Sequence, residues 1–368
     1  MPFDDITSLP RLDFAGRRVL LCADLFGPSD GVERLRPAIE PLLKARCKVL
    51  VAPQSSPTGD LAAALSTAFR VPIVELDHDF PVRVAGLEPG RLALCPPLPS
   101  YVEDAENDLD WAQRIARAVD VYVCEAPLAA REARASTVLL PQLLPSRGAG
   151  PQLASDLAMT RDFVEELSAP VSALIGGADL PRKAALLRAL VERVDHLLLG
   201  GVVASTFLVA AGVSVHDTVY EPEGLEVARD ILARARERGI ELLLPTDGLV
   251  APCAGAVLLT NRGFDQLDVG EAALDLGAET RARYEQVLRA SATVICNGVL
   301  GEKLAVTQRL WAAAAESAPY SLIAGDSSVQ HAARLGVSSR FRTLGTGGDT
   351  TLDLLAGAAL PGIESLRR

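Results

Sequence analysis

The stretch "ALIGGADLPRKAALL", residues 173–187, decides the fold. It begins as a buried strand, turns at Gly176 and Gly177, and continues as a helix. A glycine turn before a helix is typical of phosphate binding, because the backbone comes close and the helix start offers N–H groups and a positive dipole end. Asp179 stands just after that turn, where an anion would bind. The stretch therefore predicts a strand–turn–helix unit and leaves phosphate binding open.

The same alternation runs along the chain. Short apolar runs predict strands at 19–22, 49–52, 73–76, 92–95, 121–124, 173–175, 197–199, 241–244, 257–259, 293–296 and 321–324. Apolar residues between them recur at spacings of three and four, as in 180–194, which predicts one face of a helix. Alternating strands and helices indicate a parallel sheet with right-handed crossovers. We predict an α/β fold of two Rossmann-like, doubly wound parallel-sheet domains joined by a helical hinge.

A break in this alternation separates the two predicted domains. "GAGP" at 148–151 precedes a polar, amphipathic stretch that we interpret as a hinge helix. We expect an N-terminal domain at 1–150, the hinge helix at 151–169, and a C-terminal domain at 170–355. A tail at 356–368 is expected to pack back toward the N-terminal domain. Two such domains favour a ligand cleft between their strand ends.

Composition limits the setting. A net charge of −11 over 368 residues argues against a nucleic-acid or membrane partner, since both require a basic face. The six cysteines form no CxxC pair, so neither zinc nor a disulfide framework is predicted and we expect a reducing, cytoplasmic location. The uncharged stretch 197–215 is long enough to span a bilayer, but Gly200 and Gly201 interrupt it. We predict a buried strand, turn and helix there.

Five motifs, in chain order, resemble those of the phosphoglycerate kinase family. They are "DVYVCEAPLAAREARASTVLLP" at 120–141, "VDHLLLGGVVASTFLVAAG" at 194–212, "TVICNGVLG" at 293–301, "IAGDSS" at 323–328 and "GTGGDTTLDLLAGAALPG" at 345–362. The resemblance implies two hinged domains. The N-terminal domain would hold the acceptor, 3-phosphoglycerate in the family, and the C-terminal domain would hold Mg-ADP or Mg-ATP.

Several residues match the family's functional positions. The resemblance implies that Asp24 binds a substrate hydroxyl, that Arg34 bridges acceptor and transferring phosphoryl group, that Lys183 contacts nucleotide phosphate and that Asp326 carries the metal. Arg34 and Lys183 are the implied catalytic cations, and Arg131 and Arg134 are further candidates for acceptor binding. The implied nucleotide-binding residues are Gly176, Gly177, Lys183, Gly200, Asn297, Gly298, Gly347 and Gly348. Solvated helix charges, or a helix N-cap at Asp326, are the structural alternatives.

Other family positions are replaced. On the acceptor side the family's polar or basic residues have become Phe26, Pro53, Ser56, Leu98 and Glu132. Arg131 and Arg134 flank Glu132 and are expected to compensate partly for the arginine it replaces. Charge-assisted hydrogen bonds contribute about 1.5–3 kcal/mol each, so losing three would abolish useful affinity for 3-phosphoglycerate.

On the nucleotide side, two family positions carry an aspartate in this chain. Asp179 replaces the lysine that stabilises the transferring phosphoryl group, and Asp349 replaces a glycine at a helix start. Each aspartate precedes a helix, and Pro181 suits the first turn, so we predict both as N-caps. Two unit charges about 5 Å apart repel by roughly 3 kcal/mol at an effective dielectric near 20. We therefore expect that the turn at 176–179 no longer binds a transferable phosphate.

Three functions stay open at this point. The favoured one is a phosphoglycerate-kinase-like protein without that activity, kept as a binding or regulatory scaffold, with a protein partner. The second is a Mg-ATP-dependent kinase that forms an acyl phosphate on a different small carboxylic acid. The third is a residual phosphoglycerate kinase. ATP or ADP with Mg²⁺ is the cofactor if nucleotide binding survives, otherwise none, and we expect a monomer.

Overall fold

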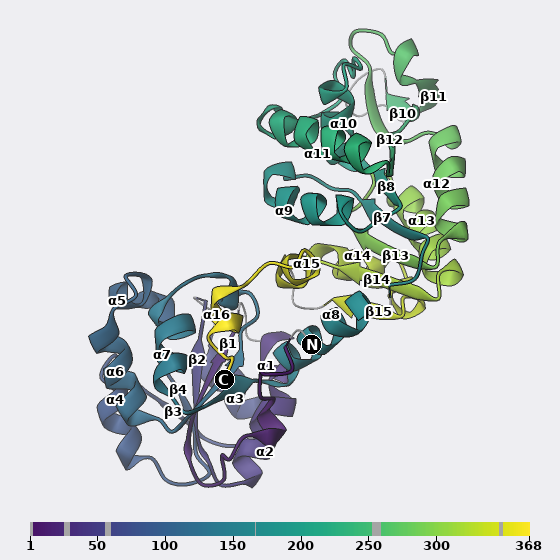
Figure 1. Cartoon of the computed structure of the whole chain (residues 1–368). Coiled ribbons are helices and arrows are strands. Elements are labelled where there is room, and N and C mark those ends of the chain that lie inside the picture. Colours follow the sequence, from purple (N-terminus) through teal and green to yellow (C-terminus); the bar gives the residue numbers. More distant parts are fainter. Residues whose placement is uncertain (1–2, 26–29, 56–59, 166, 252–258, 346–348) are drawn as a thin grey trace. The chain divides into compact units, whose positions relative to one another are not determined.

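The chain folds into two units, each built on its own six-stranded sheet (Figure 1). The computed structural model describes residues 3–25, 30–55, 60–165, 167–251, 259–345 and 349–368. Unit 1 comprises Met1–Arg161 and Ala359–Arg368, and unit 2 comprises Asp162–Ala358. The boundary between them falls inside helix α8, Pro151–Glu165.

The sheet of unit 1 has the strand order β3-β4-β2-β1-β5-β6, and every pairing in it is parallel. Its strands are β1 Arg18–Ala23, β2 Lys48–Pro53, β3 Ile73–Glu75, β4 Leu92–Leu94, β5 Val121–Glu125 and β6 Ser146–Ala149. The chain winds outward from β1 through β2 and then returns to β1's other side at β5. The carboxyl ends of β1 and β5 therefore form the switch point of this sheet, where α/β folds bind ligands.

Helices cover both faces of that sheet. They are α1 Asp30–Arg34, α2 Arg36–Lys44, α3 Leu61–Phe69, α4 Phe80–Arg83, α5 Val102–Ala105, α6 Leu109–Ala118, α7 Leu140–Leu143 and α16 Pro361–Glu364. Asp60 caps α3 and Asp108 caps α6, each through its carboxylate. Ile39 of α2 and Leu65 of α3 pack on Leu21 of β1 in one buried cluster.

The sheet of unit 2 repeats this winding in the order β15-β14-β13-β7-β8-β9, again parallel. Its strands are β7 Val171–Ile175, β8 His196–Leu199, β9 Glu241–Leu243, β13 Thr293–Asn297, β14 Tyr320–Ala324 and β15 Thr343–Gly345. Here the switch point lies at the carboxyl ends of β7 and β13. A small antiparallel sheet is added by β10 Asp247–Ala251, β11 Thr260–Gly263 and β12 Ala272–Leu276.

The helices of unit 2 flank its parallel sheet, with α9 and α11 on one side and α12 and α13 on the other (Figure 1). They are α9 Leu180–Val191, α10 Gly201–Ala210, α11 Leu225–Arg238, α12 Ala278–Ala290, α13 Leu304–Ser317, α14 Asp326–Arg334 and α15 Asp349–Leu355. The core on the α12–α13 side contains Trp311, Tyr284 and Leu310, all fully buried. The Tyr284 hydroxyl lies between the carbonyls of Leu199 and Leu243, at 2.7 and 2.8 Å.

The predicted α/β fold with two doubly wound parallel sheets is confirmed. The stretch 197–215 forms β8, a glycine turn and the buried helix α10, as predicted, and no described helix is long and apolar enough to cross a membrane. Five cysteines are buried and unpaired, while Cys253 lies outside the described residues. The strand prediction at 257–259 falls almost wholly outside them too. The pattern missed β6, β15 and the antiparallel sheet, which are short or partly exposed.

Both chain ends lie on unit 1. The last ten residues belong to it, and the Ser365 hydroxyl donates to the carbonyl of Thr137 at 2.7 Å. Arg367 forms an ion pair with Asp5 at 2.6 Å, and Ile6 pairs with Arg367 in an isolated β-bridge. The N-terminal arm and the C-terminal tail thus stabilise each other.

Candidate functional site

Three glycine turns converge at the switch point of unit 2. They follow β7, β8 and β13, and backbone hydrogen bonds join them. Gly176 N–H donates to the carbonyl of Asn297 at 2.7 Å, and Gly177 N–H donates to the carbonyl of Val299 at 2.6 Å. Gly201 N–H donates to the carbonyl of Leu300 at 2.8 Å. The implied nucleotide-binding residues Gly176, Gly177, Gly200, Asn297 and Gly298 are therefore brought together.

Close approach explains why two of these positions are glycine. A Cβ on Gly298 would lie 2.2 Å from the carbonyl oxygen of Gly176, and its φ of +80° belongs to the left-handed region. A Cβ on Gly176 would lie 2.3 Å from the carbonyl oxygen of Val299. Neither side chain could be accommodated without moving backbone. The turns can touch only because they lack side chains.

Lys183 brings a positive charge to these turns. Its ammonium donates to Asn297 Oδ1, and a Cβ on Gly177 would lie 3.9 Å from Lys183 Nζ. The amide of Asn297 is buried, and its Nδ2 donates to the carbonyl of Ala324 at 2.8 Å. The first turn of α9 therefore projects a cation to the carboxyl ends of β7 and β13. A cation at this place suits the phosphate end of a nucleotide.

The prediction that Asp179 caps α9 with its carboxylate is wrong. Asp179 occupies the N-cap position, but its backbone is left-handed (φ 65°, ψ 54°) and its side chain makes no capping bond. A capping side chain needs an extended backbone at that position. The carboxylate of Glu221 takes over, accepting from Asp179 N–H at 2.6 Å and from Leu180 N–H at 2.7 Å. Asp179 itself forms an ion pair with Arg182 at 3.5 Å on the surface.

The remaining candidates of this side are only partly described. Asp326 begins α14 and Asp349 begins α15, but their side chains lie outside the described part of the structure. Gly347 and Gly348 lie outside the described residues altogether. The metal-binding role of Asp326 and the capping role of Asp349 stay predictions.

A cavity of about 680 Å³ opens beside the three turns. Its described lining is mainly apolar, and the charged residues in it are Asp275 and Glu302. Burial raises the pKa of the Asp275 carboxyl to about 6. The other lining residues come mainly from the turn after β7, from α10 and the loop behind it, from the segment after β11, from β12 and from the loop after β13. Among them are Ala178, Val202, Leu208, Val219, Phe264, Ala272, Leu276 and Leu300. A pocket of this size and polarity fits the nucleoside part of a nucleotide.

The switch point of unit 1 is arranged differently. Asp24 follows β1, and its Oδ2 accepts from Leu128 N–H at 2.7 Å, which ties the two strand ends together. Arg34 is exposed at the end of α1. Pro53 ends β2 and is buried, and Leu98 is fully buried in the core. These last two replacements therefore lie in the interior, while Phe26 and Ser56 lie outside the described residues.

Glu132 removes the compensation that was expected from Arg134. Its Oε2 lies 2.6 Å from Arg134 Nη2, so the carboxylate that replaces the family's arginine also neutralises the next one. Arg134 further lies 3.9 Å from the buried Asp104. Arg131 is half-buried at the end of a short turn and stays a candidate.

Glu125 is a residue at this switch point that sequence reasoning missed. It ends β5, is 4% exposed, and accepts from Gln152 N–H at 3.0 Å at the start of α8. Burial raises the pKa of its carboxyl to about 7, and the neighbouring Asp156 and Asp24 act in the same direction. Its place at the carboxyl end of a parallel strand was the available signal.

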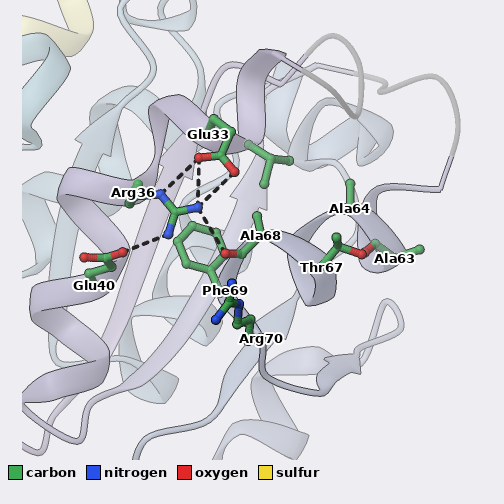
Figure 2. A pocket seen from close by; sticks show the side chains of 10 residues that line it. Glu33, Arg36, Glu40, Ala63, Ala64, Thr67, Ala68, Phe69 and Arg70 are labelled. Carbon is green, nitrogen blue, oxygen red and sulfur yellow. Dashed lines mark hydrogen bonds and ion pairs between the residues drawn. The ribbon is translucent and has the colours of Figure 1, made fainter.

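A cavity in unit 1 lies between α1, α2 and α3, with a volume of about 800 Å³ (Figure 2). Arg36 lies in its wall with its guanidinium bonded to Glu33, to Glu40 and to the carbonyl of Ala68. The same group stacks over the ring of Phe69, 5.5 Å from its centroid. These internal partners hold this arginine in place.

The geometry defines a class: a two-unit α/β protein whose second unit carries an apolar cavity and a cation at the switch point of its sheet. Comparisons with known proteins agree. The family model described as "Phosphoglycerate kinase" matches residues 9–358. Phosphoglycerate kinases of Synechococcus elongatus and Nitratidesulfovibrio vulgaris are 30% and 32% identical, over 98% of each chain. The phosphoglycerate kinase structure from Coxiella burnetii matches with a TM-score of 0.86 at 26% identity, over 98% of both chains. The chain belongs to the phosphoglycerate kinase family.

Proposed function

We propose that this protein binds ADP or ATP in unit 2 but does not phosphorylate 3-phosphoglycerate efficiently, and that it serves as a binding or regulatory scaffold. The observation that carries the proposal is the contact between Glu132 and Arg134. An acceptor that bears a phosphate and a carboxylate needs arginines with free guanidinium edges. Here a carboxylate stands in place of one arginine and pairs with the next at 2.6 Å.

The fit of unit 2 to a nucleotide supports the binding half of the proposal. The apolar cavity of about 680 Å³ accommodates the base and sugar, and Lys183 provides a cation beside Gly177 for a phosphate oxygen. Bound Mg-ATP would supply the transferable phosphoryl group, and Lys183 would orient it. Asp179 opposes this with a negative charge in place of the family's lysine.

Two measurements on the full chain test the proposal. Calorimetric titration with ADP, with and without Mg²⁺, is expected to give binding with a Kd below about 1 mM, weakened at least tenfold by Lys183→Met. A coupled assay with ATP and 3-phosphoglycerate is expected to give turnover below about 1% of the lower end of the usual enzymatic range of 1–10³ per second. Turnover within that range refutes the loss of activity, and the absence of ADP binding refutes the nucleotide-binding role.

A cytoplasmic monomer fits the same proposal. The described cysteines are buried as free thiols, and burial raises the pKa of Cys22 to about 12. Such thiols are protonated and unreactive at neutral pH. Sedimentation at micromolar concentration is expected to give the mass of one 38.8 kDa chain.

A further inference from the structure

Ser328 connects α14 to the turn that holds Lys183. Its side chain is 1% exposed, and its Oγ accepts from Gly298 N–H at 2.9 Å. Asn297 Nδ2 lies 3.5 Å from the same oxygen and donates at 2.8 Å to the carbonyl of Ala324. One buried hydroxyl therefore fixes the backbone of Gly298 and borders the amide of Asn297.

The orientation of the Asn297 amide decides which of its atoms faces Lys183. With Nδ2 bound to the carbonyl of Ala324, the acceptor oxygen Oδ1 is left to face the ammonium. The reversed amide would present hydrogens to a cation. A turn held in place at Gly298 therefore keeps the Lys183 ammonium beside Gly177.

The space around this contact allows little adjustment. A Cβ on Gly325 would lie 2.7 Å from Asn297 Nδ2 and 3.6 Å from Ser328 Oγ. A second buried serine of unit 2 makes the same kind of bond elsewhere: Ser321 is 2% exposed, and its Oγ accepts from Arg342 N–H at 3.1 Å. The two serines thus match in burial and bonding and differ in contact with the turn after β13.

We propose that Ser328 is a positioning residue that sets the affinity of unit 2 for the phosphate chain of a nucleotide by holding Asn297 and, through it, Lys183. The proposal rests on the proposed nucleotide-binding function. Ser328 does not touch the ligand. Its effect is confined to the phosphate end, because neither Ser328 nor the two residues that it contacts, Asn297 and Gly298, lines the apolar cavity that would take the base and sugar.

Two probes, adenosine and ADP, separate a positioning role from a structural one. In calorimetry, Ser328→Ala is expected to weaken ADP binding about tenfold and to leave adenosine binding within twofold. The control Ser321→Ala, which removes a buried hydroxyl bonded to Arg342 N–H, changes neither. In a Lys183→Met background, Ser328→Ala is expected to cause no further loss for ADP, because coupled residues are not additive. An equal loss for both probes, or additive losses for ADP, overturns the proposal.

A second readout does not depend on nucleotide binding. The chain has only four lysines, Lys44, Lys48, Lys183 and Lys303, so reductive ¹³C-methylation gives four lysine NMR signals beside that of the α-amine, and Lys183→Met assigns the one that matters. Ser328→Ala is expected to shift the Lys183 signal alone, and Ser321→Ala to shift none. An unmoved Lys183 signal overturns the positioning role. Absence of ADP binding by the unmodified chain refutes the proposed function, whereas ADP binding that Ser328→Ala leaves intact refutes only this inference.

Discussion

The two units use one sheet topology and treat its switch point in opposite ways. In unit 2 the strand ends carry glycine turns that touch through their backbones and border a cavity. In unit 1 the strand ends carry carboxylates that accept backbone N–H groups of the neighbouring segment, Asp24 from Leu128 and Glu125 from Gln152. The winding of a doubly wound sheet creates a crevice in both units. Side chains decide whether the crevice admits a ligand.

The difference shows which side chains turn a ligand-binding crevice into a contact between segments of the protein. Glycine keeps N–H groups and carbonyls of adjacent turns close and leaves room beside them. A carboxylate at the same kind of strand end satisfies N–H groups that a substrate anion would otherwise bind. The pairing of Glu132 with Arg134 continues this trend in unit 1, since both charges are used within the protein.

The largest effect is expected from adding a methyl group to the glycine turns of unit 2. Gly298→Ala places a Cβ 2.2 Å from the carbonyl oxygen of Gly176 at a residue with φ +80°. The overlap and the unfavourable backbone conformation together should destabilise unit 2 by about 4 kcal/mol. Urea unfolding followed by the fluorescence of Trp311, in a Trp111→Phe background, measures this unit.

Gly212→Ala is the matched control. Its φ of +88° is equally unfavourable, but an added Cβ would meet no atom within 4 Å. Only the conformational cost of about 1 kcal/mol is expected there. Equal losses in the two variants would mean that the contact between the turns contributes nothing.

The second prediction concerns the buried carboxylate of unit 1. Glu125 has a pKa of about 7 in the folded chain, against roughly 4.3 in an unfolded one. Because the folded state holds this proton more tightly, stability falls as the pH rises from about 4 to 7, by up to about 3 kcal/mol. Below the unfolded pKa the cost is absent, and above pH 7 it is complete.

Glu125→Gln removes the ionisation and should flatten this part of the pH dependence. Unfolding of unit 1, followed by Trp111 in a Trp311→Phe background, is compared at pH 5 and pH 8. Between these two pH values, the unfolding free energy of the protein with Glu125 should fall by about 2–3 kcal/mol more than that of the Glu125→Gln variant. Identical drops would show that Glu125 is ionised throughout and that α8 begins on a permanent negative charge. Asp156 and Asp24, which face Glu125, remain in both proteins.

The third prediction compares two carboxylates near the start of α9. Glu221→Ala removes the acceptor of Asp179 N–H and Leu180 N–H and should destabilise unit 2 by about 1–2 kcal/mol. Asp179→Asn, which keeps a residue that tolerates the left-handed backbone, should change stability by less than about 0.5 kcal/mol. The same Trp311 signal measures both. A larger loss for Asp179→Asn would restore Asp179 as the cap.

Periodicity predicted the strands and helices that build the two sheets, because buried parallel strands are continuous apolar runs and flanking helices are amphipathic. Glycine pairs located the turns at Gly176 and Gly200 as well. The antiparallel strands β10, β11 and β12 were not predicted, since their partly exposed residues form no continuous apolar run.

Contacts between distant segments could not be predicted. Glu221 caps a helix that begins 41 residues earlier, and Ser328 bonds to a turn 30 residues earlier. The local pattern favoured Asp179 as the cap, because an aspartate followed by a proline in the first helical turn is a common helix start. The left-handed backbone at Asp179 excludes it, and the local pattern does not show that conformation.

The smallest effect on stability is expected at Glu132. Its pair with Arg134 is partly exposed, so Glu132→Gln should change the unfolding free energy by less than about 0.5 kcal/mol. Its effect on ligands should be larger, because the variant releases the Arg134 guanidinium from Glu132 and removes a negative charge. Binding of 3-phosphoglycerate, measured by calorimetry, is expected to strengthen at least threefold, and Glu132→Arg should strengthen it further. Equal affinity in all three proteins would mean that charge does not exclude the acceptor from the switch point of unit 1. The hydrogen bonds of Asp24 with Leu128 N–H and of Glu125 with Gln152 N–H would then exclude it.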